Sequence, residues 1–427
     1  MLFNATLRPA LFLPVAVFLT ASPLPAPAQF TLSGEFRPRA ELRFGYSTLP
    51  DSSSKVAFAV SQRTRLNALY KHEKFWTYLS LQDVRVWGDE EQIKDVASTA
   101  LHEAWAEIIF SESVSLKFGR QELVYEDHRL LGNVDWTQQA RSHDAALLKL
   151  KFKKFHAHLG GAYNQQELRL FGTGYTLNNY KTLMFLWLQN EFRDNFEASL
   201  YTIADGFTST DSTSEKTKYR VTAGPALTYK KRDFTAKGSF FWQDGKSKSN
   251  QDISAYFFSV MASYQLKKLL LAVGYDYLSG SDATDPESSK EVRTFNTLYA
   301  TNHKFYGHMD YFINIPADTK NGGLIDAYLK GEFKATEKIS AGLDAHYFGL
   351  TNNVPDPENS GETLSKYLGV ELDLYGTYAF NNMVNFKIGY STLFASSSME
   401  AIKGGDKSIF NSWAWLMITV KPVFLEK

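Results

Sequence analysis

The spacing of its connections constrains the fold of this chain more than any other feature of the sequence. From residue 29 onward, apolar and polar side chains alternate with a period of two in runs of about 10–16 residues, as β-strands require. Ordinary strands have about 5–6 residues, whereas a tilted strand that crosses a membrane needs roughly 9–11. The runs therefore predict membrane-spanning strands.

Short and long connections alternate between these runs without exception. The short ones are His72-Glu73, Ser111–Ser113, Lys153-Lys154, Arg193–Asn195, Lys230–Asp233, Gln265–Lys268, Ala335–Lys338 and Asn381-Asn382. The long ones lie near 47–55, 88–98, 124–142, 165–179, 206–216, 244–252, 279–323, 349–365 and 396–408. Seventeen connections imply 18 strands, and an even number with short turns on one side is typical of outer-membrane barrels. We predict an all-β fold, an 18-stranded antiparallel transmembrane β-barrel over residues 29–427.

An aromatic side chain precedes every short connection. Aromatic rings favour the membrane–water interface, so these residues predict an aromatic girdle on the short-turn side of the barrel. Ordinary core aromatics would not follow one class of turn. The eight residues are Tyr70, Phe110, Phe152, Phe192, Tyr229, Tyr264, Phe333 and Phe380.

Residues 1–28 predict a secretory signal peptide. Arg8 supplies the positive region, Ala10–Leu19 the apolar region, and Ala26-Pro27-Ala28 a cleavage motif before Gln29. No later run has the roughly 18 consecutive apolar residues of a spanning helix. The formal net charge is zero, without the basic patch that nucleic-acid-binding proteins carry. We expect a multi-pass barrel in the outer membrane of a Gram-negative bacterium, contacting lipid and the barrel-insertion machinery, and no nucleic acid.

The stretch Phe118–Ala145 is rich in charged side chains for a loop between two strands. Its sequence GRQELVYEDHRLLGNVDW, followed by R-x-x-D-A, resembles the alginate-export family of outer-membrane β-barrel porins. A second block, Thr294–Phe312, resembles a signature of Bacteroidetes-type members of that family. Glu126 stands where the family pattern has glycine, and His143 where it has an aromatic residue. The resemblance implies a channel whose solutes are acidic oligo- or polysaccharides.

Charged residues on the first strands fall on the face opposite to the apolar one. A charge that faces lipid costs roughly 2–4 kcal/mol at the bilayer midplane, so we expect these side chains to face the lumen. Guanidinium groups bind carboxylates in bidentate fashion and stay charged at all accessible pH values. One interpretation is a track for anionic solutes, and the other is a set of internal ion pairs that stiffen the wall. The predicted lumen or substrate-path residues are Arg37, Arg39, Arg43, Arg63, Arg65, Asp83, Arg85, Arg120 and Glu122.

The run near residues 114–122 does not alternate cleanly. Leu116 and Phe118 share a face with Arg120 and Glu122, so apolar and charged side chains would point the same way. A β-bulge at Gly119 would switch the faces and resolve the conflict. We therefore predict a bulge at Gly119.

The loop at 124–142 predicts an ordered constriction rather than a solvated loop. Unpaired charges are costly away from water, and the loop and the wall carry acids that would pair with its arginines. Trp136 would anchor the loop on the wall. The predicted constriction residues are Asp127, Arg129, Asp135, Trp136, Arg141 and Asp144. The loop at 279–323 is the second candidate to fold inward or over the mouth.

Two patterns of metal-ligating residues lead to no metal prediction. His156 and His158 share one strand face, but no third ligand is identifiable, and a site needs one. Asp282, Asp285 and Glu287 read as a solvated loop tip. We predict neither a metal nor a cofactor. Because no G-x-S-x-G elbow or similar motif is present, we also predict no catalytic residues and no enzymatic activity.

The sequence thus predicts an outer-membrane channel for passive passage of anionic solutes, small molecules or acidic saccharides, through an arginine-lined lumen. Two alternatives stay open. One is a rim enzyme that hydrolyses lipid or peptide, and the other is a receptor or adhesin whose long loops bind partners while the lumen is closed. Substrate identity, direction of transport and oligomeric state are likewise open.

Overall fold

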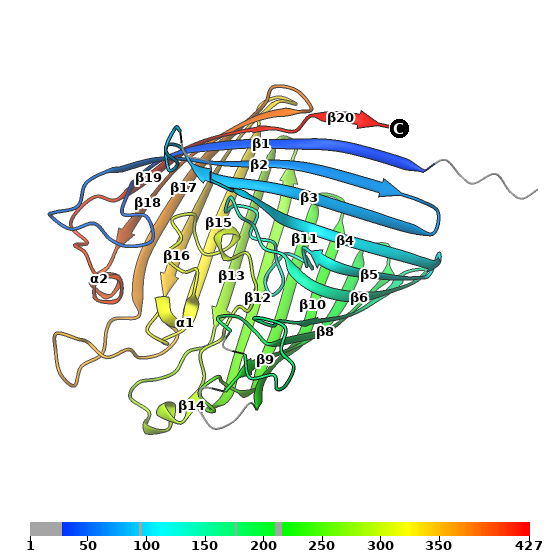
Figure 1. Cartoon of the computed structure of the whole chain (residues 1–427). Coiled ribbons are helices and arrows are strands. Elements are labelled where there is room, and N and C mark those ends of the chain that lie inside the picture. Colours follow the sequence, from blue (N-terminus) through cyan, green and yellow to red (C-terminus); the bar gives the residue numbers. More distant parts are fainter. Residues whose placement is uncertain (1–27, 94–95, 176, 210–215) are drawn as a thin grey trace, which may run out of the picture.

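The structure, a computed structural model, describes residues 28–93, 96–175, 177–209 and 216–427. In this part of the chain eighteen long strands form one antiparallel sheet that closes on itself, which confirms the predicted barrel. Figure 1 shows the strands following one another around the wall in chain order. The signal peptide remains a prediction, because residues 1–27 lie outside the described residues.

The wall is built from long strands joined alternately by short turns and long loops. They are β1 (Gln29–Phe44), β2 (Ala57–Lys71), β3 (Phe75–Val86), β4 (Thr99–Ser111), β5 (Val114–Gln121), β6 (His143–Phe152), β7 (Phe155–Tyr163), β8 (Thr182–Arg193), β9 (Phe196–Thr208), β10 (Thr217–Lys231), β11 (Phe234–Lys246), β12 (Asp252–Leu266), β13 (Leu269–Leu278), β15 (Leu324–Lys334), β16 (Ile339–Gly349), β17 (Tyr367–Ala379), β18 (Val384–Ala395) and β19 (Ser412–Val420). The short β14 (Glu291–Val292) pairs with β12, outside this order.

The barrel closes where the last strand meets the first. Leu42 of β1 lies opposite Phe58 of β2 on one side and opposite Ala414 of β19 on the other. After Pro422 the chain resumes pairing with β1 through the short strand β20 (Val423–Glu426). Proline has no N–H to donate, so the break in the ladder falls at this residue. Closure leaves no free sheet edge in the wall.

The wall has an apolar outer face and a polar inner face, because successive side chains of a strand point to opposite sides. On β17, Leu374 is 55% exposed whereas its neighbour Asp373 is completely buried. On β16, Leu343 is 50% exposed and Asp344 only 3%. The exposed leucines face the membrane, and the buried acids face the interior. On β16 and β17 the period-two pattern therefore predicts correctly which side chains face lipid.

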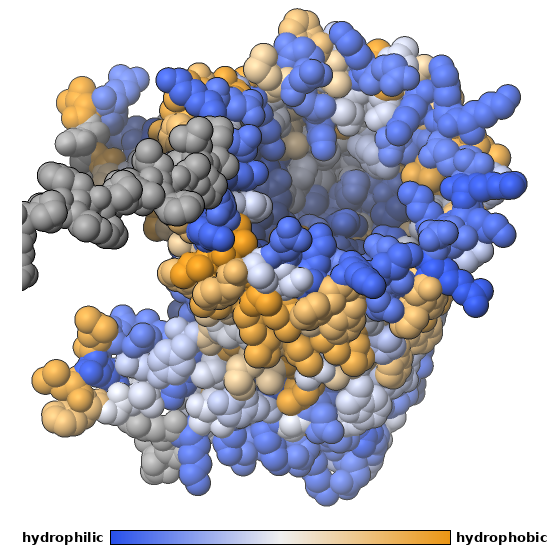
Figure 2. All heavy atoms as spheres, turned by 90° about the vertical axis from the view of Figure 1, so that its right-hand side faces the viewer, coloured by the Kyte–Doolittle hydropathy of each residue, from blue (hydrophilic) through white to orange (hydrophobic). Residues whose placement is uncertain are grey.

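Figure 2 looks onto the end of the barrel that carries the short turns. It shows a hollow bordered by hydrophilic residues and hydrophobic side chains gathered on the outer wall. The aromatic residues before the short turns lie at this end and are exposed, Phe110 and Phe192 to 60% each, while Tyr70 is half-buried. Exposed rings at one end of a transmembrane wall match the predicted interfacial girdle.

Two long connections turn into the barrel and pack against each other. We call them the first inward loop (residues 122–142) and the second inward loop (residues 279–323). They meet at a bridge between Leu131 and Tyr299, where the Tyr299 N–H donates to the Leu130 carbonyl at 2.9 Å. Leu131 is completely buried. The hydrophobic core of the molecule thus lies inside the barrel, around the two loops.

The helices of the described residues are short. The second inward loop contains the 3₁₀-helices η1 (Pro286–Ser289) and η2 (Asn302–Lys304) and the α-helix α1 (Ile315–Asp318). The helix α2 (Ser397–Lys403) lies in the last long loop, and Lys403 Nζ binds Asp318 at 2.7 Å. None of these helices has the length and apolar character needed to span a bilayer.

The predicted bulge at Gly119 is wrong. Pairing of β5 with both neighbours is continuous through Gly119, although its φ is +116°. The register shift lies instead on β4, where Ser80 is opposite Glu103 and Leu81 is opposite Leu101. A bulge depends on how two strands pair, and the alternation of one strand alone does not locate it. His102 is the extra residue.

Candidate pore constriction

Arginines on β1 and β2 fasten the first inward loop to the wall. Arg37 donates through Nε and Nη2 to Gln138 Oε1, at 3.1 and 3.0 Å, and its Nη1 lies 3.3 Å from Asp135 Oδ2. Arg63 Nη2 lies 2.8 Å from Asp135 Oδ1. Arg37 is 4% exposed and Arg63 is 1% exposed. Both guanidinium groups therefore hold the loop.

The charge of Asp135 is stabilised by these contacts. Burial works against the charged carboxylate, but the guanidinium groups of Arg63 and Arg37 outweigh it and lower the pKa of Asp135. A group with a lowered folded-state pKa stabilises the docked loop at neutral pH and loses that effect as the pH falls through the folded-state value. Asp135 thus helps to keep the loop in place at neutral pH.

Trp136 packs beneath Arg39 and reaches the second inward loop. The guanidinium carbon of Arg39 lies 4.1 Å from the Trp136 ring centroid, and Arg39 Nη1 donates to the Trp136 carbonyl at 2.7 Å. The other face of the indole stacks on His303 at 4.4 Å between centroids. Trp415 of β19 meets its edge at 4.9 Å. The indole joins the wall and both loops in one cluster.

Acids on the wall neutralise most of the charge of the arginines on β1 and β2. Arg63 binds Glu35 at 2.5 Å, and Arg39 binds Glu41 at 3.1 Å. Two guanidinium nitrogens among the described residues are buried without a protein partner, Nη1 of Arg63 and Nη2 of Arg65. The wall therefore contains internal ion pairs, as in the interpretation in which the charges stiffen the wall. It also retains two N–H donors without a protein partner.

The first inward loop crosses to the opposite wall. Arg129 Nη1 lies 2.5 Å from Asp276 of β13, and its Nε lies 2.9 Å from Asp127. Its guanidinium carbon lies 4.1 Å from the Phe305 ring centroid. Asp276 is completely buried and also accepts a hydrogen bond from Ser259. Since β1 and β13 lie far apart around the wall, a loop bound to both spans the lumen.

We expect the substitution Asp276→Asn to loosen this attachment. Asparagine keeps the shape of the side chain but leaves Arg129 with one of its two acidic partners, and a partly compensated buried charge is costly. Proteolysis within the first inward loop should become about tenfold faster, which corresponds to about 1.4 kcal/mol. Limited proteolysis of the folded barrel measures this. Cleavage at the wild-type rate would mean that Asp127 alone holds Arg129.

The second inward loop is bound to β17, which is three strands from β1 in the closed wall. The Met309 N–H donates to Glu371 Oε1 at 2.8 Å, and the His308 N–H donates to Asp373 Oδ2 at 3.4 Å. Arg141 of the first loop donates to the carbonyl of Ala300 at 3.2 Å. The two loops thus form one unit, attached to several strands.

Other charged residues of the predicted set lie nearer the mouth. Arg43 binds Glu41 at 3.0 Å, and Arg85 binds Asp83 at 2.7 Å. Arg85 also reaches Glu90 at 3.5 Å, in the long loop after β3. These arginines are paired with acids, as Arg37, Arg39 and Arg63 are. Arg65 donates instead to Gln82 Oε1 at 2.7 Å.

Arg120 and Asp144 are not on the inner face, contrary to prediction. Arg120 lies opposite Asp144 and pairs with it at 3.2 Å, with the two side chains 39% and 63% exposed. Because Gly119 forms no bulge, Arg120 keeps the outward face of Phe118. Glu122, the first residue after β5, turns inward and lies 2.9 Å from His102. The ion pair sits at the end of β5 that adjoins the first inward loop.

The two departures from the family pattern have local explanations. Glu126 has a φ of +50°, in the left-handed region that glycine adopts freely. Its carboxylate accepts a hydrogen bond from the indole of Trp187 at 2.8 Å. His143 is buried, and its Nδ1 lies 2.7 Å from the Tyr180 hydroxyl. Each side chain has a polar partner inside the barrel.

Between the inward loops and the short turns lies a cavity of about 700 Å³ that the sequence did not single out. It is lined by three lysines, Lys237, Lys304 and Lys330, by the acids Glu126, Asp127 and Glu197, and by several aromatic side chains, including Trp187, Tyr201, Phe241 and Tyr328. Lys330 is paired with Asp344 at 2.8 Å. Burial lowers the pKa of Lys304, Asp127 opposes this, and the charges of Lys237, Arg129 and Lys330 add to it. The alternation of β11 and β15 places Lys237 and Lys330 inward, but Lys304 joins them only through the folded loop.

A second cavity, of about 590 Å³, lies against β3 to β7 at the same level. Its lining includes Trp76, Tyr78 and Trp105, with the ammonium of Lys117 3.9 Å from a ring centroid of Trp105. Aromatic faces next to charged groups offer apolar contact and charge together. Both cavities therefore combine the two kinds of surface.

Comparison with known proteins places these features in a family. Residues 30–406 match the family model described as alginate export. Among solved structures, OccAB4 of Acinetobacter baumannii is 13% identical, with a TM-score of 0.61, covering 94% of this chain and 99% of that one. OpdL of Pseudomonas aeruginosa is 10% identical, with a TM-score of 0.62 and coverage of 93% and 99%. OpdK of the same organism, solved with vanillate, is 9% identical, with a TM-score of 0.59 and the same coverage. No curated protein matches.

Proposed function

Because this chain belongs to the alginate export family, we propose that it is a passive channel for anionic solutes, acidic oligo- or polysaccharides in particular. It is a multi-pass β-barrel of the Gram-negative outer membrane. The observation that carries the proposal is the basic cavity beside the inward loops, where Lys237, Lys304 and Lys330 face one space. Lys330 is paired with Asp344, whereas Lys237 and Lys304 form no ion pair among the described residues. An anion between these two ammonium groups would therefore offset their repulsion.

The chemistry of the lining suits a sugar acid. Carboxylates bind ammonium and guanidinium groups, and the apolar face of a sugar ring packs against an aromatic ring. Vanillate, present in the OpdK structure, shares only its carboxylate with a sugar acid, because its ring is aromatic. Passage needs sites that bind weakly enough to release, and single contacts of this kind meet that condition.

We expect the double substitution Lys237→Gln and Lys304→Gln to reduce anion selectivity. Glutamine keeps a hydrogen-bond donor and removes the charge, so folding should persist while the anion-to-cation permeability ratio falls by about two- to fivefold. Reversal potentials across a salt gradient in planar bilayers measure the ratio. Lys231→Gln, at the exposed end of β10 and outside the cavity, is the matched control. An unchanged reversal potential in the double variant would show that the lysines are not on the path of the ions.

Block by oligosaccharides tests the solute class separately. Acidic oligouronates should interrupt the single-channel current of the wild type, and neutral oligosaccharides of equal length should do so much less. A barrel without measurable conductance in bilayers would favour the receptor or adhesin alternative. Equal block by both sugars would overturn the preference for acids while leaving the channel itself intact.

One arrangement bears on the rim-enzyme alternative. His102 lies between Ser142 and Glu122, with Nδ1 at 3.2 Å from Ser142 Oγ and Nε2 at 2.9 Å from Glu122 Oε1. A nucleophilic serine gives its proton to the imidazole. Here the Ser142 hydroxyl donates at 2.6 Å to the carbonyl oxygen of His102. The hydroxyl is therefore not activated by the imidazole, and the arrangement favours a structural role over hydrolysis.

A further inference from the structure

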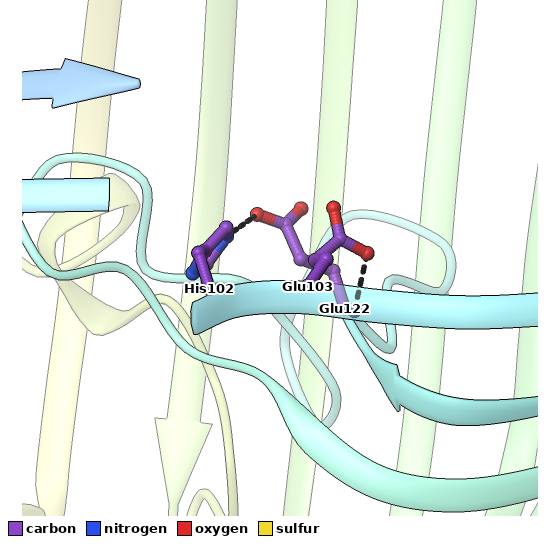
Figure 3. A group of neighbouring side chains, drawn as sticks. All are labelled: His102, Glu103 and Glu122. Carbon is purple, nitrogen blue, oxygen red and sulfur yellow. Dashed lines mark hydrogen bonds and ion pairs between the residues drawn. The ribbon is translucent and has the colours of Figure 1, made fainter. Parts of the chain in front are cut away.

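The bulge on β4 brings three potential metal ligands together at the root of the first inward loop. His102 is the extra residue of the bulge, so its side chain and that of Glu103 both turn inward. Glu122 follows the last residue of β5 and points toward them, as Figure 3 shows. One ligand atom from each of the three lies within 4.8 Å of the others. This group lies outside the arginine wall and outside the basic cavity.

The hydrogen bonds around His102 determine where its proton is. The carbonyl oxygen of His102 can only accept, so the single hydroxyl hydrogen of Ser142 points to it at 2.6 Å. Ser142 Oγ can then only accept from Nδ1 of the imidazole, at 3.2 Å. The neutral imidazole consequently turns the lone pair of Nε2 toward Glu122 Oε1, 2.9 Å away. A cation placed between Nε2 of His102 and Oε1 of Glu122 would contact both atoms.

The two carboxylates have room for such a charge. Neither Glu103 nor Glu122 forms an ion pair with a lysine or an arginine among the described residues; the ion pair of Glu122 is with His102. Their remaining contacts orient them. Asn133 Nδ2 donates to Glu122 Oε2 at 2.7 Å. Glu103 Oε2 accepts from Trp105 Nε1 at 3.2 Å and from the Glu122 N–H at 3.1 Å (Figure 3). Hydrogen bonds of this kind position ligands around a metal.

We propose that His102, Glu103 and Glu122 bind a divalent transition-metal ion. One imidazole and two carboxylates are a donor set that Zn²⁺ accepts, with about 2.0–2.2 Å to each ligand, and calcium and magnesium prefer oxygen ligands alone. The side chains need only small rotations to close on the ion. Glu103 and Glu122 line the cavity of about 590 Å³, which provides the entry path.

The position of the site gives the ion a mechanical role. Glu122 and Asn133 belong to the first inward loop, and Ser142 ends it, while His102 and Glu103 belong to the wall. A bound ion would therefore fasten both ends of the loop to β4, because Ser142 holds the imidazole and Asn133 holds Glu122. This role does not depend on which solute the channel carries.

Metal binding to the full mature barrel in detergent, stripped with chelator, tests the proposal. Calorimetric titration with ZnCl₂ should show one site per chain, and Co²⁺ should give the visible absorption of a low-coordinate complex. His102→Gln and Glu122→Gln should each weaken Zn²⁺ binding by at least about tenfold, and Ser142→Ala, a positioning variant, by about tenfold as well. His156→Gln, on β7, is the control and should bind as the wild type does.

The readout does not rely on conduction. Zn²⁺ should also raise the melting temperature of the wild type and not that of His102→Gln, because an ion that binds only the folded state stabilises it. Glu103→Gln keeps the shape of its side chain and removes the charge. If another variant fails to fold, Zn²⁺ binding and the melting temperature are measured on this variant instead. Equal affinity in wild type and His102→Gln, or no Zn²⁺ binding by the wild type, would overturn the proposal.

Discussion

Removing Asp127–Gln139 and bridging the gap with a short Gly-Ser linker should raise the single-channel conductance severalfold. These residues supply the contacts to Arg37, Arg63 and Asp276 on two distant parts of the wall. Without them the lumen widens, and Arg37 and Arg63 become accessible to water, where an unpaired charge costs little. The barrel should persist because closure rests on strand pairing alone, as between β1 and β19. Selectivity should weaken as the path widens.

A deletion of similar kind elsewhere serves as the control. Residues 356–361 form an exposed tip in the long loop between β16 and β17, with few contacts beyond the loop itself. Shortening that tip should leave the conductance of reconstituted channels unchanged. If the Asp127–Gln139 deletion also conducts as the wild type does, the narrowest point lies at the second inward loop, and the first loop does not limit the current.

Acidification should open the channel by releasing the second inward loop. Burial lowers the pKa of His308 to about 4, Asp373 opposes this, His303 and Lys330 add to it, and Asp344 opposes it more weakly. An undocked loop has a histidine with the ordinary pKa of about 6.5. Above pH 6.5 His308 is neutral whether the loop is docked or undocked, so pH does not change the docking equilibrium through this group. Between about 6.5 and 4, the undocked loop takes up a proton that the docked loop excludes, so docking weakens by up to tenfold per pH unit.

Conductance measured at a series of pH values from 7.5 to 4.5 tests this. The wild type should conduct more, or open more often, at the acidic end, and His308→Gln should lose most of that dependence. Glu371 and Asp373 hold the loop from β17 through the Met309 and His308 N–H groups, and both carboxylates stay in place in this variant. His72→Gln, in an exposed short turn, is the control for histidine titration outside the lumen. A wild-type conductance that stays constant across this range would contradict a pH-sensitive attachment.

The barrel itself could be predicted from sequence because its determinants are local. Strand number follows from the alternation of short turns and long loops, and the face of each residue follows from a period of two. The same rules place Arg37, Arg39 and Arg63 inside. These rules failed on β4 and β5, where the pairing of two strands, and not the alternation along one strand, decides which face a side chain takes. Strand pairing runs through Gly119 without a register shift, and the bulge is at His102 instead. Arg120 therefore lies on the outer face of the barrel, where it pairs with Asp144.

What only the tertiary structure decided is which charges meet. Arg37 and Asp135 are separated by 98 residues, and Arg129 and Asp276 by 147, so no spacing rule along the chain pairs them. The sequence left two interpretations of the arginine wall because each guanidinium has acids at several distances in the chain. Folding the first inward loop across the lumen selects the partners, since a charge taken from water must find an opposite charge where the loop places it. The basic cavity arises in the same way: Lys304 reaches Lys237 and Lys330 only because its loop turns inward.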